Sequence, residues 1–273
     1  MRSSNPVFSS LVGSRQRAVQ NPFQGYPADP YSQYPSAGAA TAERPITVDD
    51  VITKTGITLA VIVVMAVLNF GIAMYVSAPL AMLLTIVGAI GGLITVLIGT
   101  FGKKYGSAAI TLTYAFFEGL FVGGISLVFS GVLVGKSADA GVMIGQAVIG
   151  TVGVFLGMLY VYKTGAVKVT PRFQRIMTAA LVGVLVLALG NMMLFFVTGM
   201  NPLTNGGPLA IIFSLVCIGL AAFSFLQDFD VADRLVRSGA PARMAWGVAL
   251  GLAVTLVWLY TEILRLLSYF RGN

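Results

Sequence analysis

Seven long apolar runs make up most of this chain, and their length restricts the fold more than any other feature. Each run has roughly the 18–20 residues that a helix needs to cross the hydrocarbon core of a bilayer. Barrel strands would instead be about ten residues long, with alternating polarity. Since a spanning segment must satisfy its own backbone hydrogen bonds, helices are expected. The sequence predicts an all-α membrane protein, a seven-transmembrane-helix bundle, with spans at 57–76, 80–101, 108–134, 141–162, 176–197, 208–227 and 244–270.

The composition excludes several classes of function. Only 10% of the 273 residues are charged and 57% are hydrophobic, whereas soluble domains have about 25% charged residues. The chain has no histidine, which removes His-ligated zinc and Ser-His catalysis. Its one cysteine, Cys217, lies inside an apolar run, where a small buried side chain is the simplest interpretation. With no Walker loop and no dinucleotide-binding motif, we expect neither an enzyme nor a cofactor.

Residues 1–49 differ in composition from the rest of the chain. They are rich in Pro, Ser, Gly, Gln and Tyr, as in NPFQGYPADPYSQYPSAGAA, and they show no lasting apolar periodicity. Such a segment cannot bury enough apolar surface to order itself. It also lacks the apolar core of a signal peptide. The sequence predicts a disordered tail, either solvated or docked through its tyrosines on a membrane-protein partner.

Basic residues alternate between the two sides of the predicted bundle. One side carries Lys103, Lys104, Lys163, Lys168, Arg172, Arg175, Arg234, Arg237 and Arg243, and the other carries Lys136. An excess of Lys and Arg in short loops marks the cytoplasmic side. The net charge of +7 therefore indicates topology and contact with an anionic lipid bilayer rather than with nucleic acid. We expect a multi-pass protein of the plasma or inner membrane, with a cytoplasmic N-terminus and an external C-terminus.

Small residues recur four apart in several of the runs. Gly119 and Gly123 lie in the third run, and Gly247 and Gly251 lie in the seventh. This spacing allows helix backbones to approach closely in lipid, although glycine is also simply common in membrane helices. We expect close packing in these two runs, because both also carry acidic residues.

Acidic residues are rare, and three of them fall in or beside apolar runs: Glu118, Asp228 and Glu262. A charge at the centre of a membrane helix costs at least roughly 2.5–3.5 kcal/mol, so such residues usually face the bundle interior or water and mark ion or proton sites. The helix rise places Glu118 about 16 Å into its helix, near the midplane, and Glu262 about 28 Å up the last helix. Asp228 is expected where the sixth helix ends, at the cytoplasmic surface.

Each of these acids also has a structural interpretation. Glu118 can be a neutral side chain that hydrogen-bonds a neighbouring helix. Asp228 can belong to a solvated loop whose acids and arginines pair with one another. Glu262 can form a local pair with Arg265 on the same helix face. As ion ligands, Asp228 and Glu118 are candidates for calcium.

Three segments together carry a family pattern. Residues 118–127 read EGLFVGGISL, residues 225–230 read FLQDFD, and residues 262–267 read EILRLL. They resemble, in turn, the small-residue segment, the aromatic–Leu–x–Asp segment and the Leu-Leu-Arg-Leu-Leu tail of the transmembrane Bax inhibitor motif family, in its bacterial branch. The resemblance covers about residues 51–273 and implies seven helices with a cytoplasmic N-terminus.

The resemblance also implies a function. Members of this family look like pH-sensitive calcium leak channels, in which an acid at the end of the sixth helix and an acid in the seventh share a proton. Asp228 matches the first acid, and Lys103 or Lys104 matches a basic partner that follows the second helix. Aligning the Leu-Arg-Leu-Leu ends places Thr255 where the second acid falls, with Glu262 two turns later. Either the seventh helix sits lower than its residue count indicates, or this chain does not use a close acid pair.

The sequence therefore favours a cation (calcium) leak channel of the cell membrane, gated by protonation of membrane carboxylates. Two alternatives stay open. One is a non-conducting membrane modulator that binds a protease or a stress-response partner, and the other is a proton-coupled transporter that uses the same acids. The expected ion-pathway and pH-sensing residues are Asp228, Glu118 and Glu262, with Lys103, Lys104 and Arg265 as candidate charge partners.

Overall fold

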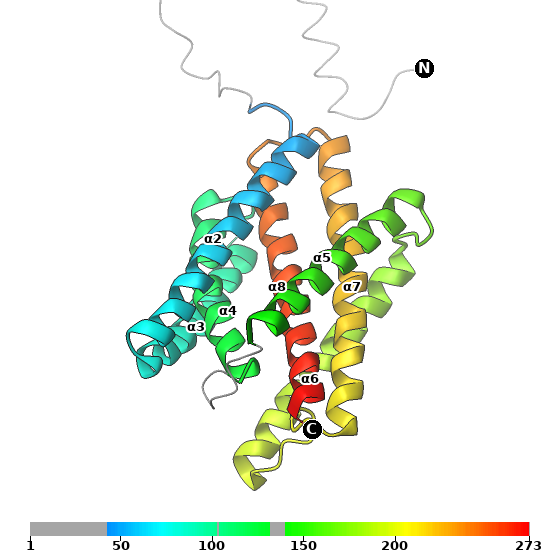
Figure 1. The fold of residues 1–273 in the computed structure, drawn as a ribbon. Helices are drawn as coiled ribbons and strands as arrows, with labels where there is room; N and C mark the ends of the chain where they lie inside the picture. Colours follow the sequence, from blue (N-terminus) through cyan, green and yellow to red (C-terminus); the bar gives the residue numbers. More distant parts are fainter. Residues whose placement is uncertain (1–42, 103, 132–139, 273) are drawn as a thin grey trace, which may run out of the picture. The chain divides into compact units, whose positions relative to one another are not determined.

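A computed structural model describes residues 43–102, 104–131 and 140–272. Most of them lie in seven helices (Figure 1): α2 (Val48–Tyr75), α3 (Ala78–Phe101), α4 (Ala108–Phe129), α5 (Ala140–Thr164), α6 (Pro171–Thr198), α7 (Pro208–Arg237) and α8 (Met244–Gly272). All seven are long and apolar enough to cross a membrane. The predicted seven-helix transmembrane bundle is thus confirmed. Lys103, Lys136 and residues 1–42 of the predicted tail, with any partner contact they make, lie outside the described residues.

Polar side chains and prolines determine where the helices begin. Thr47 caps α2 and forms a reciprocal capping box with Asp50, and Ser107 caps α4. Prolines occupy the first turn of α3, α6 and α7, where the missing N–H would have no intrahelical partner. Gly199 ends α6 in the left-handed conformation, which glycine adopts without strain.

Residues 43–47 lie against the loop between α7 and α8. The Ile46 N–H donates to the Ala240 carbonyl at 2.7 Å, and Arg44 pairs with the Asp50 carboxylate at 2.6 Å. This hydrogen bond raises the pKa of the Arg44 guanidinium above its usual value. The described part of the predicted tail is therefore ordered. α2 starts earlier than the predicted span because polar capping, and not hydropathy, determines its first turn.

The sixth predicted span ends too early in the sequence. It was expected to stop at Gln227, but α7 continues to Arg237. Two ion pairs stabilise this extension, each between residues one helical turn apart. Arg234 lies 2.9 Å from Asp230, and Arg237 lies 2.7 Å from Asp233. Hydropathy misses these turns because they are polar. In contrast, the third helix ends at Phe129, before the predicted residue 134.

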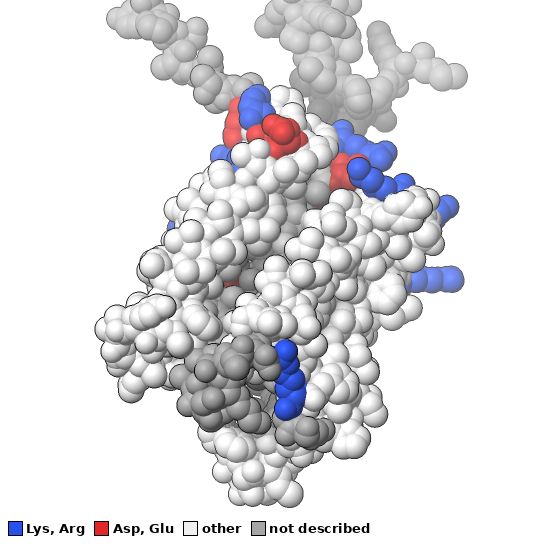
Figure 2. All heavy atoms as spheres, viewed as in Figure 1, with Lys and Arg blue, Asp and Glu red and all other residues white. Residues whose placement is uncertain are grey.

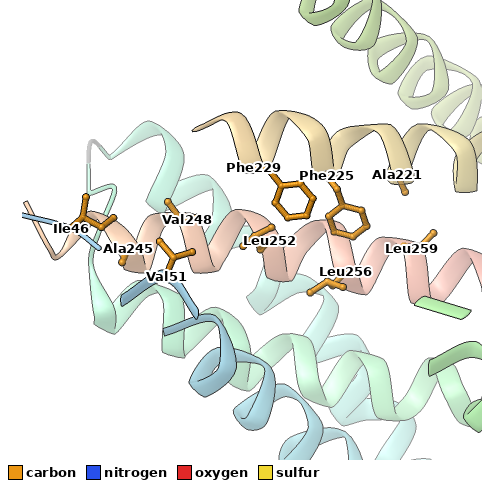
Figure 3. Packing of buried hydrophobic residues seen from close by; sticks show 10 residues of the cluster. All are labelled: Ile46, Val51, Ala221, Phe225, Phe229, Ala245, Val248, Leu252, Leu256 and Leu259. Atoms are coloured by element: carbon orange, nitrogen blue, oxygen red, sulfur yellow. The ribbon is translucent and has the colours of Figure 1, made fainter. Parts of the chain in front are cut away.

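α8 is the most enclosed helix, and it contacts α2, α4, α5 and α7. In the apolar segment of α8 that is long enough to span a membrane, 67% of the residues are buried, whereas no residue of the corresponding segment of α6 is buried. α6 packs on α7. α4 packs closely against both α2 and α3. Figure 3 shows Phe225 and Phe229 of α7 beside Leu252 and Leu256 of α8, within one buried apolar cluster. Residues on α8 are therefore placed to meet side chains from most of the bundle.

The glycines of α4 allow α2 to approach it closely. A Cβ at Gly119 would lie 2.5 Å from the Ile62 carbonyl oxygen of α2, and one at Gly123 would overlap the Ala66 carbonyl oxygen. Neither neighbour is a flexible side-chain end, because both are backbone. The expected close packing at this pair is confirmed.

We expect Gly123→Ala to destabilise the bundle by about 1–3 kcal/mol, because the added methyl group forces α2 and α4 apart. Gly153→Ala on α5 is the matched control, since nothing lies within 4 Å of a Cβ there. Thermal unfolding in one detergent measures both variants. Equal midpoints for the two variants would contradict the packing described for α2 and α4.

Basic side chains gather at one end of the described bundle (Figure 2). This end holds the last turns of α5 and α7 and the first turns of α6 and α8, with Lys163, Arg237, Arg172 and Arg243 among its residues. The distribution follows the alternation that the sequence predicts. It gives the bundle one strongly basic end.

Candidate functional site

Asp228 lies within α7 and not at its end, in contrast to the prediction. The helix extends about 13 Å beyond it, to Arg237. The Thr255 hydroxyl of α8 donates a hydrogen bond to Asp228 Oδ2 at 2.7 Å. Thr255 is the residue at which the resemblance places the second acid. The contact between α7 and α8 therefore joins a carboxylate to a hydroxyl. The resemblance implies two acids at these positions.

A cavity of about 470 Å³ adjoins this contact. Asp228 and Thr255 form part of its wall, together with residues of α3, α4, α8 and the loop between α3 and α4. Tyr105 of that loop also lines it, and burial and the nearby Asp228 carboxylate raise the pKa of the Tyr105 phenol. The remaining polar groups on the wall are Thr100, Lys104, Ser107 and Thr111. Asp228 is the one acidic side chain among the described residues that line this cavity.

Lys104, an expected charge partner, lines the same cavity. Among the ion pairs formed by the described residues, none joins Lys104 to Asp228. Lys103, the other expected partner, lies outside the described residues. The carboxylate is therefore held by a neutral hydroxyl, while a cationic side chain shares its cavity.

Glu118 lies at nearly the same level as this contact. α4 and α8 run side by side, because Thr111 donates to the Trp246 carbonyl at 2.9 Å and Ser126 bonds Tyr260 at 2.8 Å. These bonds join residues 135 and 134 apart in sequence, so Glu118 falls beside residues 252–253 of α8. The helix rise then separates it from Thr255 by only about 4 Å along the axis. The predicted separation into an inner Asp228 and a middle Glu118 is wrong, because the predicted sixth helix ends at Gln227, whereas α7 continues to Arg237.

The surroundings of Glu118 come from α3 and α4. A Cβ at Gly92 of α3 would lie 2.8 Å from Glu118 Oε2, so the carboxyl group occupies space that only glycine leaves. Tyr114, one turn earlier on α4, is buried in an apolar cluster. Three members of that cluster, Val96, Leu250 and Val254, also line the cavity beside Asp228. These side chains form an apolar layer on the wall of the cavity.

Glu262 forms a separate site about 10 Å further along α8 than Thr255. Its side chain is only 6% exposed. Arg265 donates to it at 2.9 Å and Ser214 of α7 donates at 3.1 Å. Arg265 also lies over the ring of Phe129, 5.6 Å from the centroid. The pair with Arg265 that the sequence offered as a structural alternative is present.

Several residues that lie beside these acids were not singled out from the sequence. Ser214, Tyr105 and Tyr114 are polar or amphipathic residues in or beside apolar runs, where a hydroxyl group costs free energy unless it finds a partner. That cost was the available signal. It does not indicate the partner, because Ser214 and Glu262 are 48 residues apart in sequence.

The described residues contain no group of three or more His, Cys, Asp or Glu side chains able to hold a metal ion. Calcium in a dedicated protein site takes about six to eight oxygen ligands. Asp228 and Glu118, the candidates for calcium, each stand instead as single carboxyl groups among hydroxyl and apolar neighbours. Such groups suit brief contact with a passing ion better than storage of one.

A search of curated proteins returns no match to this chain. A family model described as Bax inhibitor 1 like matches residues 5–272. The match covers almost the whole sequence, including all seven helices and the segments around Asp228, Glu118 and Glu262. The chain is therefore a multi-pass membrane protein that belongs to the Bax inhibitor 1 like family.

Proposed function

We propose that this protein is a pH-sensitive calcium leak channel of the cell membrane, gated by protonation of Asp228. The observation that carries the proposal is the position of this carboxyl group. It lies on the wall of a cavity within the bundle and is bonded at 2.7 Å to the neighbouring helix. An intramembrane acid that faces a cavity is the usual mark of an ion or proton pathway.

In this proposal, the hydrogen bond between Thr255 and Asp228 holds α7 against α8 in the closed state. A hydrogen bond to a charged carboxylate is roughly twice as strong as one between neutral groups. Protonation of Asp228 therefore weakens the link between α7 and α8. The Thr255 hydroxyl then has an alternative acceptor, the Gly251 carbonyl on its own helix at 3.2 Å. We expect the pathway to open as the pH falls.

Glu118 supplies the next step of the pathway. In this proposal, the apolar layer formed by the clustered residues Val96, Leu250, Val254 and Tyr114 separates Glu118 from the cavity. When the contact between α7 and α8 loosens, this layer is the barrier that a cation crosses to reach the second carboxyl group. Glu262 has a different role, because its charge is already balanced by Arg265. It holds the far part of α7 and α8 together.

The basic end of the bundle faces the cytoplasm in this proposal, which follows the positive-inside rule. The cavity is bounded at that end by Lys104 and Tyr105, from the loop between α3 and α4. The N-terminus is then cytoplasmic and the C-terminus external. Cysteine substitutions in the two loops that join α3 to α4 and α6 to α7, labelled from outside intact cells, test this orientation.

We expect Glu118→Gln to lower calcium uptake into liposomes by about tenfold at each pH, because it removes the charge that attracts the ion beyond the apolar layer. The pH response should persist, since Asp228 is unchanged. Glu118→Asp keeps the charge and should retain most of the uptake. A Glu118→Gln variant that conducts like the wild type would exclude Glu118 from the pathway.

A further inference from the structure

A second and larger cavity, of about 940 Å³, lies between α2, α5, α7 and α8. Its volume is within the range of about 300–1,000 Å³ that is typical of sites for small molecules. The walls are mainly apolar, and several wall side chains are exposed, such as Ile52 at 65% and Leu156 at 55%. In a membrane these side chains face acyl chains. The cavity is thus a groove that lipid can reach from the side.

The groove is basic at one end. Lys163 lies in the last turn of α5 and Lys168 follows the helix, and both line the groove and are exposed. Arg237 of α7 also lines it, but it pairs with Asp233 at 2.7 Å. Neither Lys163 nor Lys168 forms an ion pair with another described residue. Two positive charges therefore remain to be balanced at this end.

A polar group without a partner lies further inside. Thr55 of α2 lines the groove and is 8% exposed. Its hydroxyl oxygen is buried and has no hydrogen-bond partner among the described residues. It lies about 10 Å along α2 from the start of the helix. The ester groups of a phospholipid likewise follow its headgroup, on the side of the acyl chains.

We propose that this groove binds an anionic phospholipid of the leaflet that contacts the basic end of the bundle. The apolar wall takes an acyl chain, Lys163 and Lys168 bind the phosphate of the headgroup, and the Thr55 hydroxyl donates to an ester carbonyl. Basic pockets between transmembrane helices recognise lipid headgroups through this combination of charge and apolar surface. The site is separate from the cavity beside Asp228, and it does not depend on calcium conduction.

Phosphatidylglycerol and phosphatidylcholine are the probes that test the site. The purified full chain is mixed with each lipid in detergent, and native mass spectrometry measures the lipid retained. We expect tighter retention of phosphatidylglycerol. Lys163→Gln with Lys168→Gln should lower its affinity by roughly thirtyfold, since each basic group near a headgroup contributes a factor of about five. Arg172→Gln with Arg175→Gln removes the same charge from α6, outside the groove, and should change little.

A second pair of variants tests the groove without changing charge. Gly56 lines the groove, and nothing lies within 4 Å of a Cβ there, so Gly56→Leu fills the groove without a clash. Gly71 on the same helix is equally free and does not line the groove, so Gly71→Leu is its control. Thr55→Val should lower the affinity for both lipids by about threefold to tenfold, because both lipids carry the ester carbonyl to which Thr55 donates.

The expected result is loss of retained phosphatidylglycerol in Gly56→Leu and in the double lysine variant, with both control variants like the wild type. The melting temperature of each variant, measured without added lipid, shows that the fold is intact. Equal retention of the two lipids by the wild type would overturn the proposal. So would undiminished retention in Gly56→Leu, since lipid would then bind elsewhere on the bundle.

Discussion

Asp228→Asn should abolish the pH dependence of calcium uptake and hold uptake at the high level that the wild type reaches in acid. The asparagine side chain has nearly the shape of a protonated aspartic acid but cannot ionise. It therefore fixes the contact between α7 and α8 in its weakened form. A hydrogen bond to a charged group is worth about 1.5–3 kcal/mol, so uptake at high pH should rise by about tenfold or more. Reconstitution in liposomes that contain a calcium indicator measures the effect.

Two further variants make this result specific. Thr255→Val removes the hydroxyl that bonds Asp228 but leaves the carboxylate, so it should raise uptake at high pH and reduce the response to acid. Asp230→Asn is the control, because Asp230 pairs with Arg234 on the surface of the same helix. Its pH profile should match the wild type. A normal pH profile in Asp228→Asn would remove Asp228 from the gate.

Glu262→Gln should destabilise the folded protein by about 3 kcal/mol, because it leaves the Arg265 guanidinium without its carboxylate. The two charged groups are 2.9 Å apart, and the side chain of Arg265 is 21% exposed and that of Glu262 is 6% exposed. Breaking a buried pair by removing one partner is strongly destabilising. The thermal unfolding midpoint of the purified protein, measured in one detergent at one pH, reports this loss.

The surface pair on α7 provides the control for this prediction. Asp230→Asn removes an ion pair in which the Arg234 side chain is 59% exposed, and exposed pairs contribute about 0–1 kcal/mol. Its midpoint should stay close to that of the wild type. If Glu262→Gln unfolds at the same temperature as Asp230→Asn, then the buried pair of Glu262 and Arg265 on α8 does not stabilise the fold.

The number and type of helices could be predicted from the sequence because a membrane requires apolar segments of fixed length. The ends of the helices were harder to predict. The last turns of α7 are polar and are held by pairs with Arg234 and Arg237, which a hydropathy pattern does not detect. The first turn of α2 depends on a capping box at Thr47, whose signal is a short polar motif.

The site was only partly predictable for a related reason. The rarity of acids identified Asp228, Glu118 and Glu262, since buried charge is costly in any membrane fold. Their relative depth depends on the register between helices, which bonds such as the one from Thr111 to the Trp246 carbonyl reveal. No local pattern encodes that register. Aligning the C-terminal ends places Thr255 at the position of the family's second acid, and the structure shows that the Thr255 hydroxyl bonds Asp228.

The most direct test of the proposed function is calcium uptake by liposomes that contain the wild-type protein, compared with protein-free liposomes, from about pH 6 to about pH 8. We predict uptake above that of protein-free liposomes, rising by about tenfold as the pH falls. Uptake equal to that of protein-free liposomes at every pH would contradict the proposal that this protein conducts calcium.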